Sequence, residues 1–111
     1  MIPFEFEYLR PKSVRAAVGA FQQLTAAGKR PIYYAGGTEI VTGARQNKVR
    51  MDAVIDLKGI PELVEHGRDG DRLRFGAATS LSAITEANAW PLLSDCLGRI
   101  ADHTSRVQIT L

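Results

Sequence analysis

Short runs of strand-forming residues alternate with amphipathic segments over the first half of the chain. Phe4–Tyr8 alternates aromatic residues with glutamate, which is the two-residue period of a strand with one buried face. Two further strands are predicted over Ile32–Ala35 and Ala53–Leu57. Strands that are joined through helices run parallel, with right-handed crossovers. This order therefore predicts a small parallel βαβαβ unit over residues 1–57.

The two connecting segments of this unit are predicted to be helices. Ser13 is placed to cap the first helix, Val14–Ala27, in which apolar residues recur every three or four positions until Gly28 supplies a stop. Thr38 is placed to cap the second helix, which has an apolar face and is expected to continue to about Asn47.

The pattern changes near Lys58–Pro61, which is the only candidate boundary between two subdomains. The run Leu63–His66 and the alternating run Leu73–Ala77 flank a polar turn at Arg68–Asp71, an arrangement typical of an antiparallel hairpin. Residues 58–111 are therefore expected to begin a second, mixed or antiparallel subdomain. The chain as a whole is predicted to have an α+β fold.

Two helices are predicted after the hairpin. They cover Leu81–Asn88 and Pro91–His103, and Trp90–Pro91 marks the break between them. Ser80 and Ser82 stand near the start of the first helix and are interpreted as caps. The second helix is expected to turn five residues toward the core, namely Leu92, Leu93, Cys96, Leu97 and Ile100.

Composition argues against several functions. The 14 basic and 12 acidic residues are interspersed and leave a net charge of +2, which disfavours nucleic acid and anionic membranes as partners. No apolar run is long enough to span a membrane, and the first residues lack the pattern of a signal peptide. Cys96 alone makes neither a disulfide nor a thiolate metal site, and His66 and His103 lack partners at metal-ligand spacing. A cytoplasmic protein without its own metal is expected.

The stretch from Tyr33 to Ile40, YYAGGTEI, places paired glycines between a predicted strand and a predicted helix. Glycines allow the backbone to approach an anion closely, and free amides at a helix start favour negative charge. Phosphate binding is one interpretation, and a tight turn with no ligand is the other. The stretch matches neither a Walker loop nor the G-x-G-x-x-G dinucleotide motif.

Four segments carry a resemblance to a known family. In order along the chain, YYAGGTEI, AVIDLKGIPEL, LRFGAATSLSAI and ADHTSRVQITL resemble the first part of the FAD-binding domain of the xanthine dehydrogenase and carbon monoxide dehydrogenase medium-subunit family. The resemblance covers nearly the whole chain. It implies a vanillyl-alcohol-oxidase-like (PCMH-like) FAD fold, incomplete here, and not a Rossmann fold.

The resemblance also implies which residues bind FAD. In the family, a first glycine motif lays backbone amides and a Thr or Ser hydroxyl against the FAD pyrophosphate. A second motif begins with Thr-Ile or Thr-Leu before Gly-Gly-Asn, and Thr110–Leu111 match its opening. The implied cofactor-binding residues are Tyr33, Tyr34, Ala35, Gly36, Gly37, Thr38, Glu39 and Thr110.

The tail departs from the family in one place. Where the family usually has Gln-Ile-Arg-Asn, Thr104–Val107 keeps the arginine as Arg106 but replaces the asparagine, which puts any contact of that asparagine in doubt. His103 also matches the family at its place. Ile100 falls where some relatives place an aromatic residue near the flavin.

The function implied by the resemblance is electron transfer. A molybdopterin-binding large subunit would oxidise the substrate, 2Fe-2S clusters in a small subunit would pass electrons singly to FAD, and FAD would deliver them to an acceptor. This chain is expected to supply no catalytic residue, and Asp56, at a strand end, is interpreted as a structural acid bonded to nearby backbone N–H groups. Alone, it is expected to be inactive and to bind FAD weakly or not at all, because half of the pyrophosphate cradle is missing.

Two alternatives stay open. One is an assembly or interaction module that keeps the fold but binds no flavin, and the other is a stand-alone flavoenzyme of the same superfamily. A Gly-Gly-Asn continuation after Leu111 in the parent gene would favour cofactor binding. Neighbouring genes for a molybdenum subunit and an iron–sulfur subunit would argue against the stand-alone enzyme.

Overall fold

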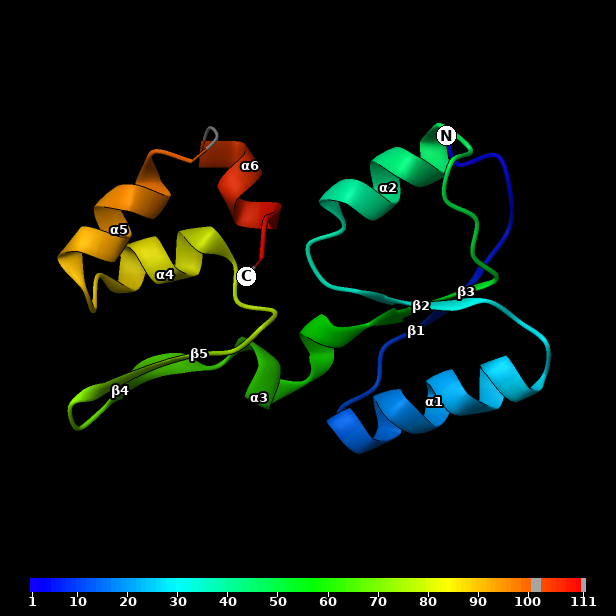
Figure 1. The fold of residues 1–111 in the computed structure, drawn as a ribbon, viewed down its shortest axis with the longest axis horizontal. Coiled ribbons are helices and arrows are strands. Elements are labelled where there is room, and N and C mark those ends of the chain that lie inside the picture. Colours follow the sequence, from blue (N-terminus) through cyan, green and yellow to red (C-terminus); the bar gives the residue numbers. More distant parts are fainter. Residues whose placement is uncertain (101–102, 111) are drawn as a thin grey trace. The chain divides into compact units, whose positions relative to one another are not determined.

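The computed structural model describes residues 1–100 and 103–110, which form two compact units, Met1–Pro61 and Glu62–Leu111. The first unit contains a three-stranded sheet and the second a two-stranded hairpin, and each also contains helices (Figure 1). The predicted α+β fold class is confirmed. The change from one unit to the next falls after Pro61, at the end of the segment where the sequence pattern changes.

The first unit is a parallel sheet, as the alternation of strands and helices predicted. One helix lies on each face of this sheet (Figure 1). Both strand pairs of this sheet are parallel, and β3, the last of its strands in sequence, lies in the middle, in the order β1-β3-β2. A short 3-10 turn, η1, follows the middle strand. The elements are β1 (Glu7–Leu9), α1 (Val14–Ala26), β2 (Pro31–Tyr34), α2 (Thr38–Arg45), β3 (Ala53–Asp56) and η1 (Leu57–Gly59).

The core of the first unit is built around β3, whose four residues are all buried. On the α2 side of the sheet, Val54 packs with Ala44 and Met51 in one cluster. Successive side chains of a strand point to opposite faces, so Ile55, which is fully buried, faces the α1 side. The middle strand is therefore covered by side chains on both faces, and it is paired with a neighbouring strand on both edges.

The first strand is shorter than the Phe4–Tyr8 alternation predicted. It begins at Glu7, because its partner β3 begins at Ala53, and these two residues are paired in register. Phe4 packs against the core cluster on the α2 side and is not part of the sheet. Phe6 is 37% exposed. The alternating aromatic pattern therefore reflects packing of the segment before the strand as well as the strand itself.

The helix boundaries of the first unit confirm one predicted cap and correct another. Ser13 Oγ accepts a hydrogen bond from the amide of Ala16 at 3.1 Å, as predicted. Thr38 is not the cap of α2, because Gly37 occupies that position and makes no side-chain bond. Thr38 is instead the first residue of the helix, and α2 ends at Arg45, two residues before the predicted Asn47.

The second unit contains a short helix, then a hairpin, then three further helices. The hairpin is antiparallel, as predicted, with His66 opposite Phe75. Leu63 and Val64 were expected to begin its first strand, but they lie in a helical turn. The elements are α3 (Pro61–Val64), β4 (His66–Asp69), β5 (Arg72–Phe75), α4 (Leu81–Ala87), α5 (Pro91–Gly98) and α6 (His103–Gln108).

A separate core holds the second unit together. Leu81, Ile84 and Leu97 are its buried residues, so α4 packs against α5. Ser80 accepts a hydrogen bond from the amide of Ala83 at 3.2 Å and caps α4, as predicted. Ser82, the other predicted cap, is buried inside the helix.

The last predicted helix is the main error in the second unit. Instead of a helix over Pro91–His103, α5 ends at Gly98 and a further helix, α6, begins at His103. The break at Trp90–Pro91 is confirmed. Cys96, predicted to be in the core, is exposed, because α5 turns Ser94 and Leu97 inward instead.

Candidate functional site

The glycine turn joins the end of β2 to the start of α2. Gly37 has φ 76° and ψ 0°, a left-handed conformation that costs other residues about 1 kcal/mol. A Cβ at this position would also overlap the ring of Tyr34, which lies directly against the turn. Glycine is therefore favoured at residue 37 both by the backbone conformation and by the position of the Tyr34 ring.

The turn presents backbone amides that have no partner in the described part of the chain. Val41 is the first residue of α2 whose amide bonds to a carbonyl of the turn, that of Gly37, at 2.8 Å. The amides of Gly36, Gly37, Thr38 and Glu39 donate to no acceptor within residues 1–100 and 103–110. Thr38 and Glu39 are exposed. An open turn with free amides at a helix start has the chemistry of an anion site, because donors and the helix dipole both favour negative charge.

A buried carboxylate and a lysine lie next to this turn. Asp56, at the end of β3, is 4% exposed. Its Oδ1 accepts hydrogen bonds from the backbone N of Lys58 at 2.9 Å and from Lys58 Nζ at 2.8 Å. Its Oδ2 accepts a hydrogen bond from the hydroxyl of Tyr8. The interpretation of Asp56 as a structural acid bonded to a nearby backbone N–H is confirmed.

These contacts set the protonation of the pair formed by Asp56 and Tyr8. Burial raises the pKa of the Asp56 carboxyl, but hydrogen bonds from Lys58 and Tyr8 outweigh burial and hold the pKa below its usual value. The hydrogen bond to Asp56 in turn raises the pKa of the Tyr8 hydroxyl. Asp56 is therefore ionised and Tyr8 is neutral at neutral pH.

A pocket of about 290 Å³ lies on the α2 side of the sheet, beside the turn. Its walls are mostly apolar, and its polar edge is formed by Tyr8, Asp56 and Lys58. Tyr34, Ile40 and Val41 connect it to the turn and to the first residues of α2. The remaining lining residues are Ile2, Phe6, Met51 and Val54.

The structure separates some of the residues that the resemblance assigned to FAD. Ala35, Gly36, Gly37, Thr38 and Glu39 form the turn and the first residues of α2. Tyr34 lies on the pocket side of the sheet. Tyr33 faces the opposite side, where its ring stacks on Phe21 with centroids 4.7 Å apart.

The other assigned residue belongs to the second unit. Thr110 forms an isolated antiparallel bridge with Ser80, and the neighbouring Leu81 amide donates to the Ile109 carbonyl at 2.9 Å. Ile100, which falls where some relatives place an aromatic residue, is 48% exposed, and its carbonyl accepts a hydrogen bond from Arg106. Whether these residues bind the cofactor stays a prediction.

Sequence reasoning did not identify Tyr8 and Lys58 as neighbours of the turn. Their position follows from topology, since parallel strands place their carboxyl ends at one edge of the sheet, and β3 lies between the other two. The sequence signal that could have found Lys58 is its place just after the acid that ends the central strand.

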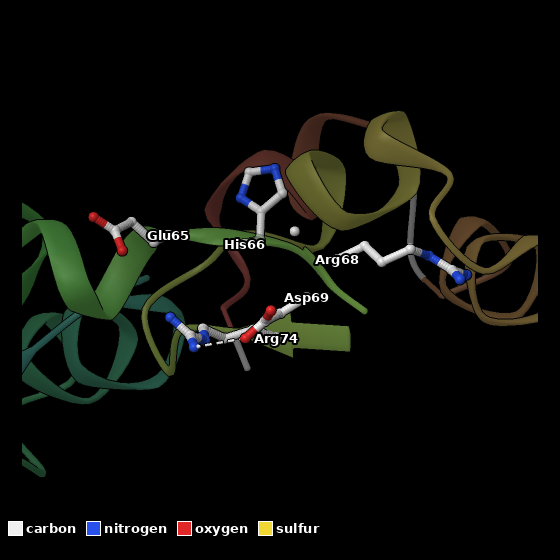
Figure 2. A pocket seen from close by; sticks show the side chains of 6 residues that line it. Glu65, His66, Arg68, Asp69 and Arg74 are labelled. Carbon is white, nitrogen blue, oxygen red and sulfur yellow. Dashed lines mark ion pairs between the residues drawn. The ribbon is translucent and has the colours of Figure 1, made fainter. Parts of the chain in front are cut away.

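A second pocket, of about 360 Å³, lies along the charged hairpin (Figure 2). Figure 2 shows one ion pair there, between Arg74 and Asp69 at 3.6 Å, and both side chains are at least 70% exposed. Exposed pairs of this kind contribute about 1 kcal/mol or less. His66 is also exposed, and its Nδ1 lies 3.3 Å from the Val64 carbonyl. This pocket is a solvated hairpin surface and supplies no buried group for chemistry.

Two kinds of feature are absent from the described residues. Within residues 1–100 and 103–110, no group of three or more His, Cys, Asp or Glu residues is arranged to hold a metal ion. In the same part of the chain, no helix has both the length and the apolar character needed to cross a membrane.

Comparison with known proteins gives consistent results. Residues 4–111 match the family model described as the FAD binding domain in molybdopterin dehydrogenase. The chain is 34% identical to the carbon monoxide dehydrogenase medium chain of Hydrogenophaga pseudoflava, and the match covers 100% of this chain and 39% of that protein. The corresponding medium chain of Afipia carboxidovorans is 32% identical, with the same coverage. The chain thus spans about 39% of the length of the curated relatives it matches.

The solved structures agree. A structure of carbon monoxide dehydrogenase from Hydrogenophaga pseudoflava that lacks the Mo-pyranopterin moiety matches with a TM-score of 0.87 at 31% identity, covering 99% of this chain and 39% of that chain. This likeness confirms the fold that the sequence resemblance implied. The chain therefore belongs to the family of FAD-binding domains of molybdopterin dehydrogenases.

Proposed function

We propose that the chain is part of the FAD-binding subunit of a molybdenum hydroxylase-type dehydrogenase, and that its glycine turn binds the diphosphate of FAD. The observation that carries this proposal is the set of free amides at Gly36, Gly37, Thr38 and Glu39, in a family defined by FAD binding. Each amide can donate to a phosphate oxygen, and the exposed Thr38 hydroxyl adds one more donor.

The residues around the turn also fit the cofactor. The ring of Tyr34 lies against Gly37 and limits the conformations open to that residue, which lowers the entropy lost on binding. In this proposal Tyr34 and Thr110 are further contacts with FAD. Tyr33 has a structural role and does not contact FAD, because its ring stacks on Phe21.

FAD, when bound, supplies the redox chemistry, since flavins accept electrons one at a time and release them in pairs. The protein's part is to bind and orient the flavin. By analogy with the carbon monoxide dehydrogenase relatives, we infer that a molybdenum subunit and an iron–sulfur subunit are its partners. Iron–sulfur clusters are held by several cysteines and this chain has one, so we assign the molybdenum and iron–sulfur centres to those partners. We assign the complex to the cytoplasm, in keeping with the single cysteine.

Cofactor analysis of the complete product of the parent gene tests this proposal. Purified protein is expected to show flavin absorption bands and to release FAD on acid denaturation. Flavin-free protein is expected to quench FAD fluorescence on titration. The absence of both signals would favour the alternative, a module that keeps the fold but binds no flavin. The 111-residue chain alone is expected to bind FAD weakly or not at all.

A further inference from the structure

Lys58 makes three contacts that tie the end of β3 to the glycine turn. Its Nζ donates to the carbonyl oxygen of Ala35 at 2.7 Å and to Asp56 Oδ1 at 2.8 Å. The same ammonium lies 4.2 Å from the centroid of the Tyr34 ring. The Lys58 side chain is 37% exposed. Through these contacts it links the buried Asp56 to the glycine turn.

The buried acid is itself fixed from two sides. Asp56 Oδ2 accepts from the Tyr8 hydroxyl on β1, and Oδ1 accepts from the backbone N of Lys58. Asp56 also belongs to the central strand, which is paired on both edges. A carboxylate with both oxygens bonded cannot rotate freely, and a charge-assisted bond holds the ammonium more strongly than a neutral acceptor does. Asp56 therefore determines where Nζ of Lys58 sits.

The contact with Ala35 has a consequence for the next residue. The carbonyl of Ala35 and the amide N–H of Gly36 belong to one planar trans peptide unit, in which the two groups point in opposite directions. When Lys58 holds the carbonyl, the Gly36 N–H is turned away from Lys58. Gly36 is one of the turn residues whose amide has no acceptor in the described part of the chain.

We propose that Lys58, anchored by Asp56, is a positioning residue that aims the Gly36 amide at the diphosphate of FAD. The inference rests on the proposed function and adds to it, because it assigns the preorganisation of the turn to two side chains outside the glycine motif. In this inference Lys58 acts through the backbone, since two of the three N–H donors of its ammonium are directed to oxygen atoms of the chain itself.

Three substitutions in the complete flavin-free protein separate these roles. Lys58→Met removes the donor, and Asp56→Asn replaces the charged acceptor by a neutral one, which weakens the anchor but leaves the lysine charge. Lys48→Met is the matched control, because Lys48 is exposed and its side chain has no hydrogen bond or ion pair within the described residues. We expect Lys58→Met and Asp56→Asn each to weaken FAD binding by about tenfold, and Lys48→Met to change it less than about twofold.

The sign of the Asp56→Asn effect decides between positioning and charge. If Lys58 acted only as a positive charge near the phosphates, removing the neighbouring carboxylate would make the site more positive and tighten FAD binding. Tighter binding by Asp56→Asn would therefore overturn the inference. A double variant that binds no more weakly than the weaker single variant would support it, because the two residues would then act as one unit.

A second measurement does not depend on flavin. Backbone order parameters of Gly36 and Gly37 in the flavin-free protein are expected to fall in Lys58→Met and stay unchanged in Lys48→Met. Lys58→Arg, which keeps a charged donor, is expected to restore them at least in part. If the wild-type protein binds FAD but Lys58→Met binds it equally well, the inference fails and the proposed function stands. If the wild-type protein binds no FAD, the proposed function fails and takes this inference with it.

Discussion

The ring of Tyr34 fills the space that a side chain at Gly37 would need. Two costs therefore meet at residue 37, a left-handed backbone and a direct overlap. Gly28, which follows α1, has nearly the same φ of 77°, but a Cβ added there would meet no other atom within 4 Å. The two glycines therefore share a backbone conformation, but only at Gly37 would an added side chain overlap another residue.

The first prediction compares alanine at these two positions. Gly28→Ala is expected to lower the free energy of unfolding by about 1 kcal/mol, from the backbone conformation alone. Gly37→Ala is expected to lower it by at least about 2 kcal/mol, because the ring of Tyr34 must also move. Urea unfolding of the two variants measures both values, and equal losses would show that the ring imposes no constraint.

The second prediction concerns the hydroxyl of Thr38. Thr38→Val is expected to weaken FAD binding about fivefold, because one donor to phosphate is lost while the helix is kept. Thr42→Val is the control, since the Thr42 hydroxyl bonds to the Thr38 carbonyl within α2 at 2.9 Å. Fluorescence titration of the complete protein with FAD measures both. A larger loss in the control would indicate a helix effect and not a ligand contact.

The third prediction separates the two tyrosines of β2. Tyr34→Leu is expected to weaken FAD binding, because Tyr34 lies against the turn and lines the adjacent pocket. Tyr33→Leu is expected to leave FAD binding unchanged and to lower the free energy of unfolding by about 1 kcal/mol, through loss of stacking on Phe21. If instead Tyr33→Leu weakens binding as much as Tyr34→Leu does, the purely structural role given to Tyr33 is wrong.

The fourth prediction is a pH dependence of stability. The pKa of Asp56 is held below 3.8 in the folded chain, so the unfolded state takes up its proton first as the pH falls. The stabilisation is therefore fully present above the ordinary aspartate pKa and is lost as the pH falls through the lower, folded value. Urea unfolding between about pH 6 and about pH 2.5 is expected to show a fall in the wild-type protein that is smaller in Asp56→Asn.

Asp52→Asn serves as the control for this measurement. Its partner Arg30 lowers the pKa of Asp52 through hydrogen bonds, but both side chains are exposed, so solvent screens the pair. Most of the acid-dependent fall should therefore survive in Asp52→Asn. If Asp56→Asn and wild type lose stability in parallel, the carboxylate contacts at Asp56 are not stabilising.

Local patterns predicted the layout of the first unit well. The two-residue and 3.6-residue periods are local properties of the sequence, and so are the boundary residues Ser13 and Gly28. They suffice to predict the succession of strands and helices along the chain. The family resemblance located the glycine turn because the glycine motif is one continuous stretch of sequence, which is also a local property. Features that depend on contacts across the fold were missed, among them the bond from Lys58 to Ala35.

The errors have the same physical origin. Thr38 looked like a cap because its residue type is right, but Gly37 adopts a left-handed conformation that puts the cap one residue earlier. Cys96 looked like a core residue because it lies among apolar neighbours. In α5 the buried residues are Ser94 and Leu97 instead. Which face of α5 is buried depends on its packing against α4, which the local sequence does not reveal.

The central place of β3 has a consequence for how the first unit is assembled. Neither β1 nor β2 pairs with the other, and both pair only with β3, whose residues are Ala53–Asp56. A nascent chain that ends before Ala53 can form helical turns, but it has no strand ladder to close. The bond from Lys58 to the glycine turn, which depends on the end of β3, therefore cannot form before that last strand has paired with the two earlier ones.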